Sequence, residues 1–412
     1  MAKACKRPTW FASVALPVLA LAASSPVVAA RTTITPPLAP PYAGAYQPVG
    51  KDEIGLWQRD DEAEKHLAAS AQLLVAPALT AYVHHVLCET VGEDRCKGVR
   101  AYIVRDPMYN ASMSPNGTLR VWSGLFLRAH NEAELGAVLG HEFGHFEKRH
   151  TLAAFKGERS GQSLLAWASV LSIMASNYGY RDSHFDQMRV DVYGNLRHFD
   201  RDQEREADAI GVSYLNSSSL RPQAAAQFWQ TVMAEQDRSA AVRGLKRPDF
   251  RGVAFFADHP PDEERAETDA RLALPSAANR EDGTAAYRQA LAPWLPQLLN
   301  DQLKLNDFGG TDYLIQAMGD ADGWSAPLYF ARGELYRLRG NPRDLTSAID
   351  FYGQAIALDP KLADAYRGLG LAQMRSGLVA PARETLSRYL VLQPQARDAA
   401  MIATLIQSDG DR

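Results

Sequence analysis

The sequence predicts an α+β protein in two parts, a mostly helical domain that contains a small sheet and, behind it, an all-α domain of repeated helical hairpins. Three observations support this fold class. Short strand-like segments lie between residues 99 and 122, apolar residues recur at helical spacing through most of the rest, and the last third is internally periodic. With 412 residues the chain is also too long for one ordinary domain.

The composition is that of a soluble globular protein, with 46% apolar and 22% charged residues. The formal net charge is −4, so the chain carries no basic excess. A nucleic-acid partner is therefore not expected.

Residues 1–30 have the layout of a cleavable secretory signal peptide. Basic residues come first, an apolar run covers residues 10–23, and small residues surround Ala30. A membrane anchor is the weaker alternative, because the run is short and contains Pro17. The sequence thus predicts an exported, soluble protein of the periplasm, with secretion as the alternative location.

A flexible linker, then helices, then a small sheet are expected after the signal. Residues 31–50 are rich in proline, threonine and alanine, which is typical of a linker. Helical periodicity follows over residues 51–89, with Pro77 as a break. Residues 99–105 alternate like a strand, and two further strand-like segments flank the turn sequence Pro-Asn-Gly at residues 115–117, which predicts a hairpin.

Two cysteines, Cys88 and Cys96, follow the predicted signal. In an oxidising compartment a disulfide between them is favoured, and a pair of reduced, partly buried thiols is the alternative. Two thiolates without further cysteine partners do not make a zinc site, so these residues are not expected to be metal ligands.

A helix with a recognisable start carries a candidate metal site. Asn131 is its expected cap, and Glu134 stands in the capping-box position. His141 and His145 are four positions apart, so both imidazoles project from one face and can bind the same ion. Glu142 cannot easily bind that ion, but it can reach a water beside it, as a zinc hydrolase requires.

A third ligand is expected on another helix, because a catalytic zinc ion takes three protein ligands and keeps one open position. A helix predicted to begin near Asp200 supplies Glu204 and Asp208, which share one face. Glu204 is the expected third ligand, and Asp208 is expected to accept a hydrogen bond from the outer nitrogen of a ligand histidine. Glu206 is expected to point to solvent.

Residues 163–176 form a strongly apolar stretch that is too short to span a bilayer. A core helix is the main interpretation. The alternative is a segment that covers the active site or makes peripheral contact with a membrane.

The last third contains two copies of a pattern of small and apolar residues. The copies lie at 333–360 and 365–394, and their positions match the tetratricopeptide repeat, which predicts a repeat domain over residues 326–406. Residues 396–406 are its expected capping helix. Residues 276–325 are predicted to be a helical connector, and whether they hold a degenerate repeat stays open.

Several segments resemble one known family. Residues 138–150, VLGHEFGHFEKRH, and residues 200–211, DRDQEREADAIG, resemble the gluzincin family of the HtpX heat-shock protease and the CAAX prenyl protease. Residues 110–117 resemble its edge strand and turn, and His259-Pro260-Pro261, with Arg265 beyond, resembles its downstream motif. The layout of signal, catalytic domain and repeats is similar to that of exported members of this family.

The resemblance implies a zinc metalloprotease domain over residues 51–275 and a role for each candidate residue. Glu142 is the general base, and Asp208 holds a ligand histidine or donates a proton. His259 either stabilises the oxyanion or closes the site as a fourth zinc ligand; a histidine that only begins a turn is the alternative. His150 is interpreted as structural. The ligands of the one zinc ion (Zn2+) per chain are His141, His145 and Glu204, and the substrate edge strand is Asn110, Ala111, Ser112 and Met113.

The expected function is hydrolysis of peptide bonds by an exported zinc endopeptidase. The resemblance implies unfolded or misassembled envelope proteins as substrates, in quality control or in assembly of outer-membrane proteins, and a protein partner on the repeats. The alternative is a chaperone or adaptor that binds through its repeats while the zinc site stays latent. An enzyme held at a membrane by residues 163–176 is a third hypothesis.

Overall fold

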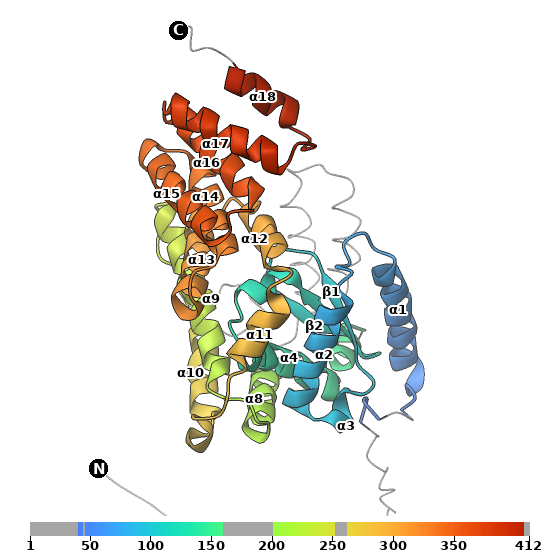
Figure 1. Cartoon of the computed structure of the whole chain (residues 1–412). Coiled ribbons are helices and arrows are strands. Elements are labelled where there is room, and N and C mark those ends of the chain that lie inside the picture. The colour runs from blue at the N-terminus through green and yellow to red at the C-terminus, as the bar shows by residue number, and fades with distance from the viewer. Residues whose placement is uncertain (1–39, 44–45, 160–200, 252–261, 408–412) are drawn as a thin grey trace, which may run out of the picture. The chain divides into compact units, whose positions relative to one another are not determined.

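The computed structural model describes residues 40–43, 46–159, 201–251 and 262–407 (Figure 1). Several predicted features lie outside these residues and are not described further: the signal peptide, most of the linker, the apolar stretch 163–176, the helix cap at Asp200, and His259. Among the helices of the described ranges, none is both long and apolar enough to cross a membrane.

The first two helices lie where the sequence predicted helical periodicity, with a break before Pro77. Helix α1 covers Gly50–Ala68, α2 covers Pro77–Val91 and α3 covers Glu93–Cys96. Pro77 begins α2, where its fixed φ suits a helix and its missing N–H is not needed. Gly92 ends α2 at φ +98°, a conformation that residues with a Cβ rarely adopt, and so turns the chain into α3.

Three short strands form the sheet, in the order β1-β3-β2. Strands β2 (Ala111–Met113) and β3 (Thr118–Trp122) pair antiparallel, and Gly117 adopts φ +88° in the turn between them, so the predicted hairpin is confirmed. Strand β1 (Arg100–Val104) pairs with β3 in parallel, which the sequence did not predict. Strand β3 is therefore central and fully buried, and β2 lies at an edge.

Helix α4 (Glu132–Glu147) begins at the predicted cap. The side-chain oxygen of Asn131 accepts a hydrogen bond from the N–H of Glu134 at 2.8 Å. The carboxylate of Glu134 in turn accepts a hydrogen bond from the N–H of His130 at 2.9 Å, one residue earlier than in the usual capping box. A 3-10 helix, η1 (Ser123–Leu127), precedes α4, and α5 (His150–Arg159) follows it.

Helices α8, α9 and α10 form a group beside α4. They cover Arg201–Ser217, Ala224–Val242 and Asp262–Leu272, and both α8 and α9 contact α4 (Figure 1). Helix α10 packs against α8 and α9 in turn. The helix that carries the two candidate histidines thus lies between the sheet side, through its contact with β2, and this group of helices.

The remaining helices are a connector and the repeats. After the 3-10 helix η2 (Pro275–Ala277), the connector consists of three helices rather than one hairpin, and its last helix packs on α9. Tyr352 is fully buried between the repeat helices, where Gly333 and Gly368 leave room for its ring. In order, the helices are α11 (Thr284–Leu291), α12 (Leu295–Leu303), α13 (Phe308–Asp322), α14 (Ala326–Arg339), α15 (Pro342–Leu358), α16 (Ala363–Arg375), α17 (Val379–Leu392) and α18 (Ala399–Gln407).

Candidate metal centre

Three side chains converge where α4 crosses α8. His141 Nε2 lies 3.0 Å from His145 Nε2, one turn further along α4. The two carboxylate oxygens of Glu204, in the first turn of α8, lie 3.6 Å from His141 Nε2 and 3.5 Å from His145 Nε2. All three side chains are buried, and Glu204 has no exposed surface. The ligand atoms of the three residues lie within 4.8 Å of one another.

This donor set fits a zinc ion. Two imidazole nitrogens and one carboxylate are a set found at catalytic zinc, which takes three protein ligands and leaves a position open. A fully buried carboxylate also needs a positive charge close by, because removing an anion from water is costly unless it is paired. The two imidazoles supply that charge only when protonated, whereas a bound cation supplies it with the imidazoles neutral.

Glycines allow α4 and α8 to approach closely enough to form this group. A Cβ on Gly211 of α8 would lie 3.1 Å from the backbone nitrogen of His141. On α4, a Cβ on Gly140 would lie 3.4 Å from Gly211 Cα, and one on Gly144 would lie 3.2 Å from the side chain of Ile210. The absence of side chains at this crossing lets Glu204 reach the histidines across the two helices.

Asp208 lies one turn after Glu204 and faces His141. Its Oδ1 is 2.8 Å from His141 Nδ1. Arg265 of α10 donates to the same carboxylate through Nε at 2.9 Å and through Nη2 at 2.5 Å, and its guanidinium lies 3.8 Å from the ring centre of Trp229. Burial raises the pKa of Asp208, but the charge of Arg265 and the hydrogen bond from His141 outweigh it and hold this pKa below its usual range.

Glu142 is half-buried beside the convergent residues, with Oε1 4.0 Å from His141 Nε2. It lines a cavity of about 370 Å³ together with His141, Asn110 and Ala111. Apolar side chains of α4, α8 and α9 form much of the cavity wall, and three charged residues of α10 line the same cavity: Asp262, Arg265 and Asp269. The predicted base and part of the predicted edge strand therefore face one cavity.

The predicted edge strand is only partly at this cavity. Asn110 and Ala111 line it, whereas Ser112 and Met113 continue along β2 and are not among the residues that line it. Strand β2 lies at the edge of the sheet and contacts α4, so its backbone runs beside the helix that carries Glu142.

Two further polar residues, His150 and Glu206, lie close to His145. His150, interpreted as structural, lies with Nδ1 2.9 Å from His145 Nδ1. Glu206, expected to point to solvent, keeps 45% of its side chain exposed but lies 3.2 Å from His150 Nε2 and 2.7 Å from Lys148 Nζ. Glu206 thus remains exposed to solvent, and α8 also brings its carboxylate over the start of α5.

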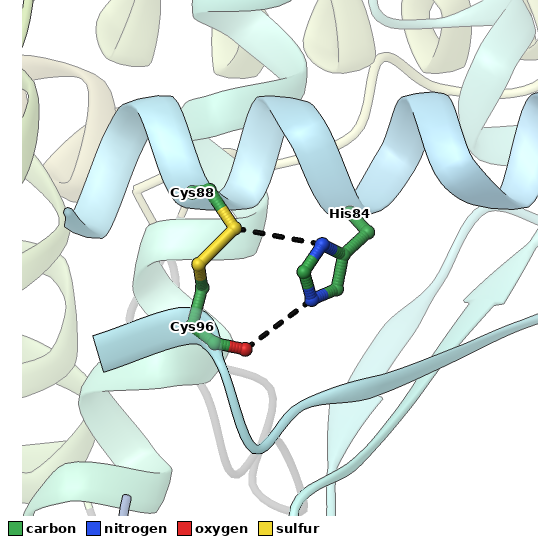
Figure 2. Close-up of side chains that lie close together, drawn as sticks. All are labelled: His84, Cys88 and Cys96. Atoms are coloured by element: carbon green, nitrogen blue, oxygen red, sulfur yellow. Dashed lines mark hydrogen bonds between the residues drawn. A yellow bond between two sulfur atoms is a disulfide. The ribbon is translucent and has the colours of Figure 1, made fainter. Parts of the chain in front are cut away.

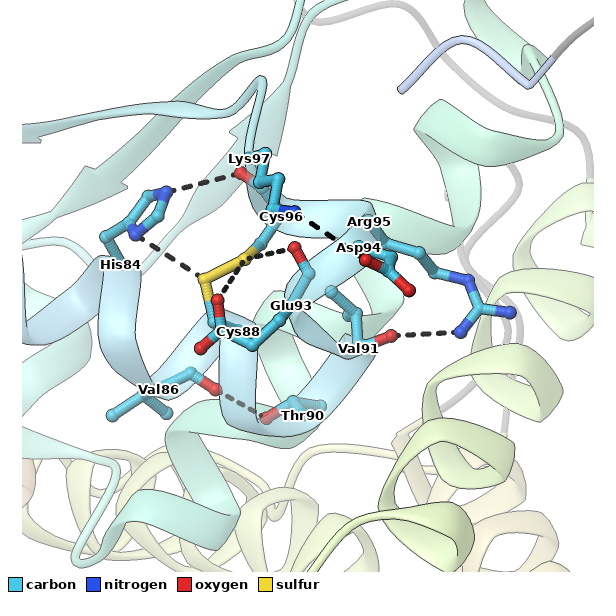
Figure 3. The surroundings of a disulfide bond; sticks show 10 residues. All are labelled: His84, Val86, Cys88, Thr90, Val91, Glu93, Asp94, Arg95, Cys96 and Lys97. Carbon is cyan, nitrogen blue, oxygen red and sulfur yellow. Dashed lines mark hydrogen bonds and ion pairs between the residues drawn. A yellow bond between two sulfur atoms is a disulfide. The ribbon is translucent and has the colours of Figure 1, made fainter. Parts of the chain in front are cut away.

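A second group of possible ligands lies at the end of α2 (Figure 2). Cys88 and Cys96 form the favoured disulfide, which ties α2 to α3 (Figure 3). His84 Nδ1 lies 3.5 Å from Cys88 Sγ, and its Nε2 lies 3.2 Å from the carbonyl oxygen of Cys96. Since the disulfide uses both sulfur atoms, neither Cys88 nor Cys96 offers a thiolate to a metal ion.

The sequence places Arg265 in the motif that follows His259, but it does not indicate which residues Arg265 contacts. Its partner Asp208 is 57 residues earlier in the chain, so the pair depends on how α10 packs against α8. The signal available in the sequence was an arginine six residues after His259 in the motif. The position of His259 itself lies beyond what the structure describes.

Comparisons with known proteins cover both parts of the chain. Residues 77–270 match peptidase family M48, and residues 328–377 match a TPR repeat. A beta-barrel assembly-enhancing protease of Yersinia pestis is 30% identical over 181 residues, which is 42% of this chain and 36% of that protein. The mitochondrial metalloendopeptidase OMA1 of Schizosaccharomyces pombe is 26% identical over 188 residues, 45% of this chain and 50% of that protein.

A further relative is the metalloprotease YcaL of Escherichia coli (strain K12), 29% identical over 169 residues, 41% of this chain and 59% of that protein. The matches to these relatives thus span from 36% to 59% of their own lengths.

Proposed function

We propose, from the premise that this chain carries a peptidase family M48 domain followed by a TPR repeat, that it is a zinc-dependent endopeptidase. One observation carries the proposal: two imidazoles and a carboxylate converge beside a half-buried glutamate at the wall of a cavity of about 370 Å³. The zinc ligands in this proposal are His141, His145 and Glu204, and the catalytic domain extends over residues 51–275.

Zinc, when bound, supplies a Lewis acid that polarises a carbonyl and makes water acidic near neutral pH. Glu142 is the general base in this proposal: it takes a proton from the attacking water and returns it to the leaving amine. Asp208, kept ionised by Arg265, accepts a hydrogen bond from Nδ1 of His141 and so holds its ring with Nε2 toward Glu204. His259 keeps its proposed role at the oxyanion or as a closing ligand.

Substrate binding in this proposal uses the backbone of β2 and the cavity. An extended peptide can add to an edge strand through main-chain hydrogen bonds, which require no particular sequence. Asn110 and Ala111 line the cavity at the end of β2, so a bound strand would pass beside Glu142, while apolar walls accept one side chain. The substrate is therefore an unfolded or misassembled protein segment.

The cellular setting is also a proposal. The name of the Yersinia relative, a beta-barrel assembly-enhancing protease, supports envelope proteins as substrates and a part in outer-membrane protein assembly. The predicted signal peptide supports a periplasmic location. The repeat helices α14 to α17 supply the surface for a protein partner.

Substitution of the base tests this function. Glu142→Gln keeps the shape of the side chain and leaves the three ligands intact, so we expect one zinc per chain with unchanged affinity. Cleavage of an unfolded envelope protein should fall by about 100- to 10,000-fold, because general base catalysis contributes that much. Cleavage is followed by gel electrophoresis, with the exposed Glu62→Gln as the matched control. Cleavage by Glu142→Gln at the wild-type rate would refute the proposal.

A chaperone or adaptor remains the second candidate, favoured by the TPR repeat at residues 328–377. It makes the opposite prediction for the same variant in cells. If Glu142→Gln supports outer-membrane protein assembly as well as the wild type does, binding through the repeats is the main function. If assembly fails while the variant still captures unfolded protein, cleavage is required.

A further inference from the structure

We propose that His150 is a positioning residue of the zinc centre, which accepts a hydrogen bond from the outer nitrogen of His145 and donates one to Glu206. The inference rests on the proposed zinc site, and it adds two residues that are not ligands, His150 and Glu206. It assigns a role to the buried imidazole of His150, which the cleavage mechanism above does not use.

The proton positions on the rings follow from the geometry. Nε2 of His145 faces His141 and Glu204, so this nitrogen is the one available to a metal. A neutral imidazole bound through Nε2 carries its proton on Nδ1. That proton points at His150 Nδ1, 2.9 Å away, which must therefore be the acceptor. The remaining proton of a neutral His150 is then on Nε2, which lies 3.2 Å from Glu206 Oε2.

The hydrogen bonds run from His145 to His150 and from His150 to Glu206, which forms an ion pair with Lys148. The carboxylate of Glu206 also accepts from Lys148 Nζ at 2.7 Å. A carboxylate paired with an ammonium group accepts hydrogen bonds from its other neighbours. Glu206 therefore lies where it can accept from His150 Nε2, which leaves Nδ1 of His150 to face His145.

Burial makes His150 difficult to replace by water. His145 is 2% exposed and His150 is 4% exposed. If His150 lost its nitrogen atoms, the Nδ1–H of His145 would lose this buried acceptor, and the loss of such a hydrogen bond costs about 1–3 kcal/mol. The ring of His145 could then rotate away from its metal-binding orientation to find another partner.

The conformation of the turn between α4 and α5 places His150 beside His145. Arg149 adopts φ +55°, a left-handed conformation that a residue other than glycine or asparagine rarely takes. Its side chain contacts α1 and the segment before it: the guanidinium lies 3.5 Å from a carboxylate oxygen of Glu53 and 4.9 Å from the ring centre of Tyr46. This turn folds His150 back onto the helix that carries His145.

The test measures zinc affinity in the folded, metal-free protein by competition with a chromophoric chelator. His150→Phe keeps a planar ring but has no acceptor, and we expect zinc affinity to fall by about 10- to 100-fold. His150→Asn has an oxygen near the position of Nδ1, so it should recover most of the loss. His130→Phe, at the other end of α4, is the matched control and should leave zinc affinity unchanged.

A purely structural role for His150 makes a different prediction. His150→Phe and His150→Asn would then lower the unfolding free energy of the metal-free protein equally and leave zinc affinity unaltered, which would overturn the inference. If His150→Phe does not fold, Glu206→Gln is used instead, because its half-exposed side chain tolerates change, and a smaller fall in zinc affinity is expected. Unchanged affinity in Glu206→Gln would then overturn the inference.

The wild-type protein separates this inference from the proposed function. Wild-type protein that binds no zinc refutes the zinc site and the inference together. Wild-type protein that binds zinc tightly and cleaves substrate, beside a His150→Phe variant of equal affinity, overturns the inference alone. We also expect excess zinc to restore most of the cleavage activity of His150→Phe, because Glu142 is intact.

Discussion

The two histidines of α4 that we propose as zinc ligands contact different chemical groups. Nδ1 of His141 lies against the carboxylate of Asp208, whose charge is fixed by Arg265, whereas Nδ1 of His145 lies against the imidazole of His150. A carboxylate that accepts from a histidine ligand fixes its tautomer and raises its basicity. In the proposed zinc site, His141 is therefore held by a charged acceptor and His145 by an imidazole.

A buried acid at the start of α4 makes stability depend on pH. Burial raises the pKa of Glu134 to about 7, from 4.5 in the unfolded chain, although the His130 N–H and the Asn131 side chain donate to it. The folded protein thus binds this proton more tightly than the unfolded chain does. The resulting stabilisation is complete below about pH 4.5 and is lost as the pH rises to about 7.

Glu134→Gln keeps the hydrogen-bonding shape but cannot titrate. Between pH 4.5 and 7 we expect the unfolding free energy of the wild type to fall by about 3 kcal/mol relative to that of the variant. Urea unfolding of both proteins across this pH range measures the difference. Parallel pH profiles for the two proteins would show that Glu134 ionises normally in the folded state.

At the residue scale, local signals were predictable and long-range contacts were not. The cap at Asn131 and the spacing of His141 and His145 involve residues within one helix, and helix geometry fixes their relation. The contact between His150 and Glu206 joins residues 56 positions apart. It depends on the turn at Arg149 and on the crossing of α4 with α8, neither of which a periodic pattern specifies.

The proposed metal site depends on the close packing of helix α4 against helix α8. Its close approach relies on Gly140 and Gly211, whose missing side chains allow backbone to meet backbone. Gly211→Val would place methyl groups against the backbone of His141, since a Cβ there already lies 3.1 Å from its nitrogen. We expect a loss of about 1–3 kcal/mol in unfolding free energy and weaker zinc binding, because Glu204 moves away with α8.

Gly55→Ala is the matched control, because nothing lies within 4 Å of a Cβ at that position of α1. We expect it to stabilise the protein by about 0.5–1 kcal/mol, through the higher helix propensity of alanine, and to leave zinc affinity alone. Both quantities are measured by urea unfolding and chelator competition. Wild-type zinc affinity in Gly211→Val would show that the crossing does not set the ligand geometry.

At the element scale, the hairpin was predictable because a turn sequence joins adjacent strands. The parallel pairing of β1 with β3 was not, since it places residues 18 positions apart side by side without a local signal. In the connector, the sequence predicted helices correctly. It did not predict that there are three of them or that α13 packs on α9, because those features depend on contacts with distant residues.

On the scale of the whole molecule, the family resemblance and the repeats predicted from sequence are both confirmed by the matches to peptidase family M48 and to the TPR repeat. Direct packing joins the two regions. Helix α14, the first of the repeats, contacts α12 and α13, and Arg105, next to β1, forms an ion pair with Asp301 of α12 at 2.6 Å.

Metal removal should act on one part of this molecule. Zinc at 100 times its dissociation constant stabilises a folded domain by about 2.7 kcal/mol. We therefore expect a chelator to lower the unfolding temperature of the region that holds the proposed zinc site more than that of the repeats. Differential scanning calorimetry with and without zinc resolves the two. Glu204→Ala is the control and should show no zinc-dependent shift; an equal shift in that variant would place the bound zinc elsewhere.

Strand β2 is only three residues long and lies at the edge of its sheet. A polypeptide can pair with it only while its own backbone groups have no partners, and a finished fold leaves almost none of them unpaired. Under the proposed function, the rate at which a protein folds or assembles, rather than its sequence, would decide whether it is cleaved. Slower assembly would then expose more of a substrate to cleavage.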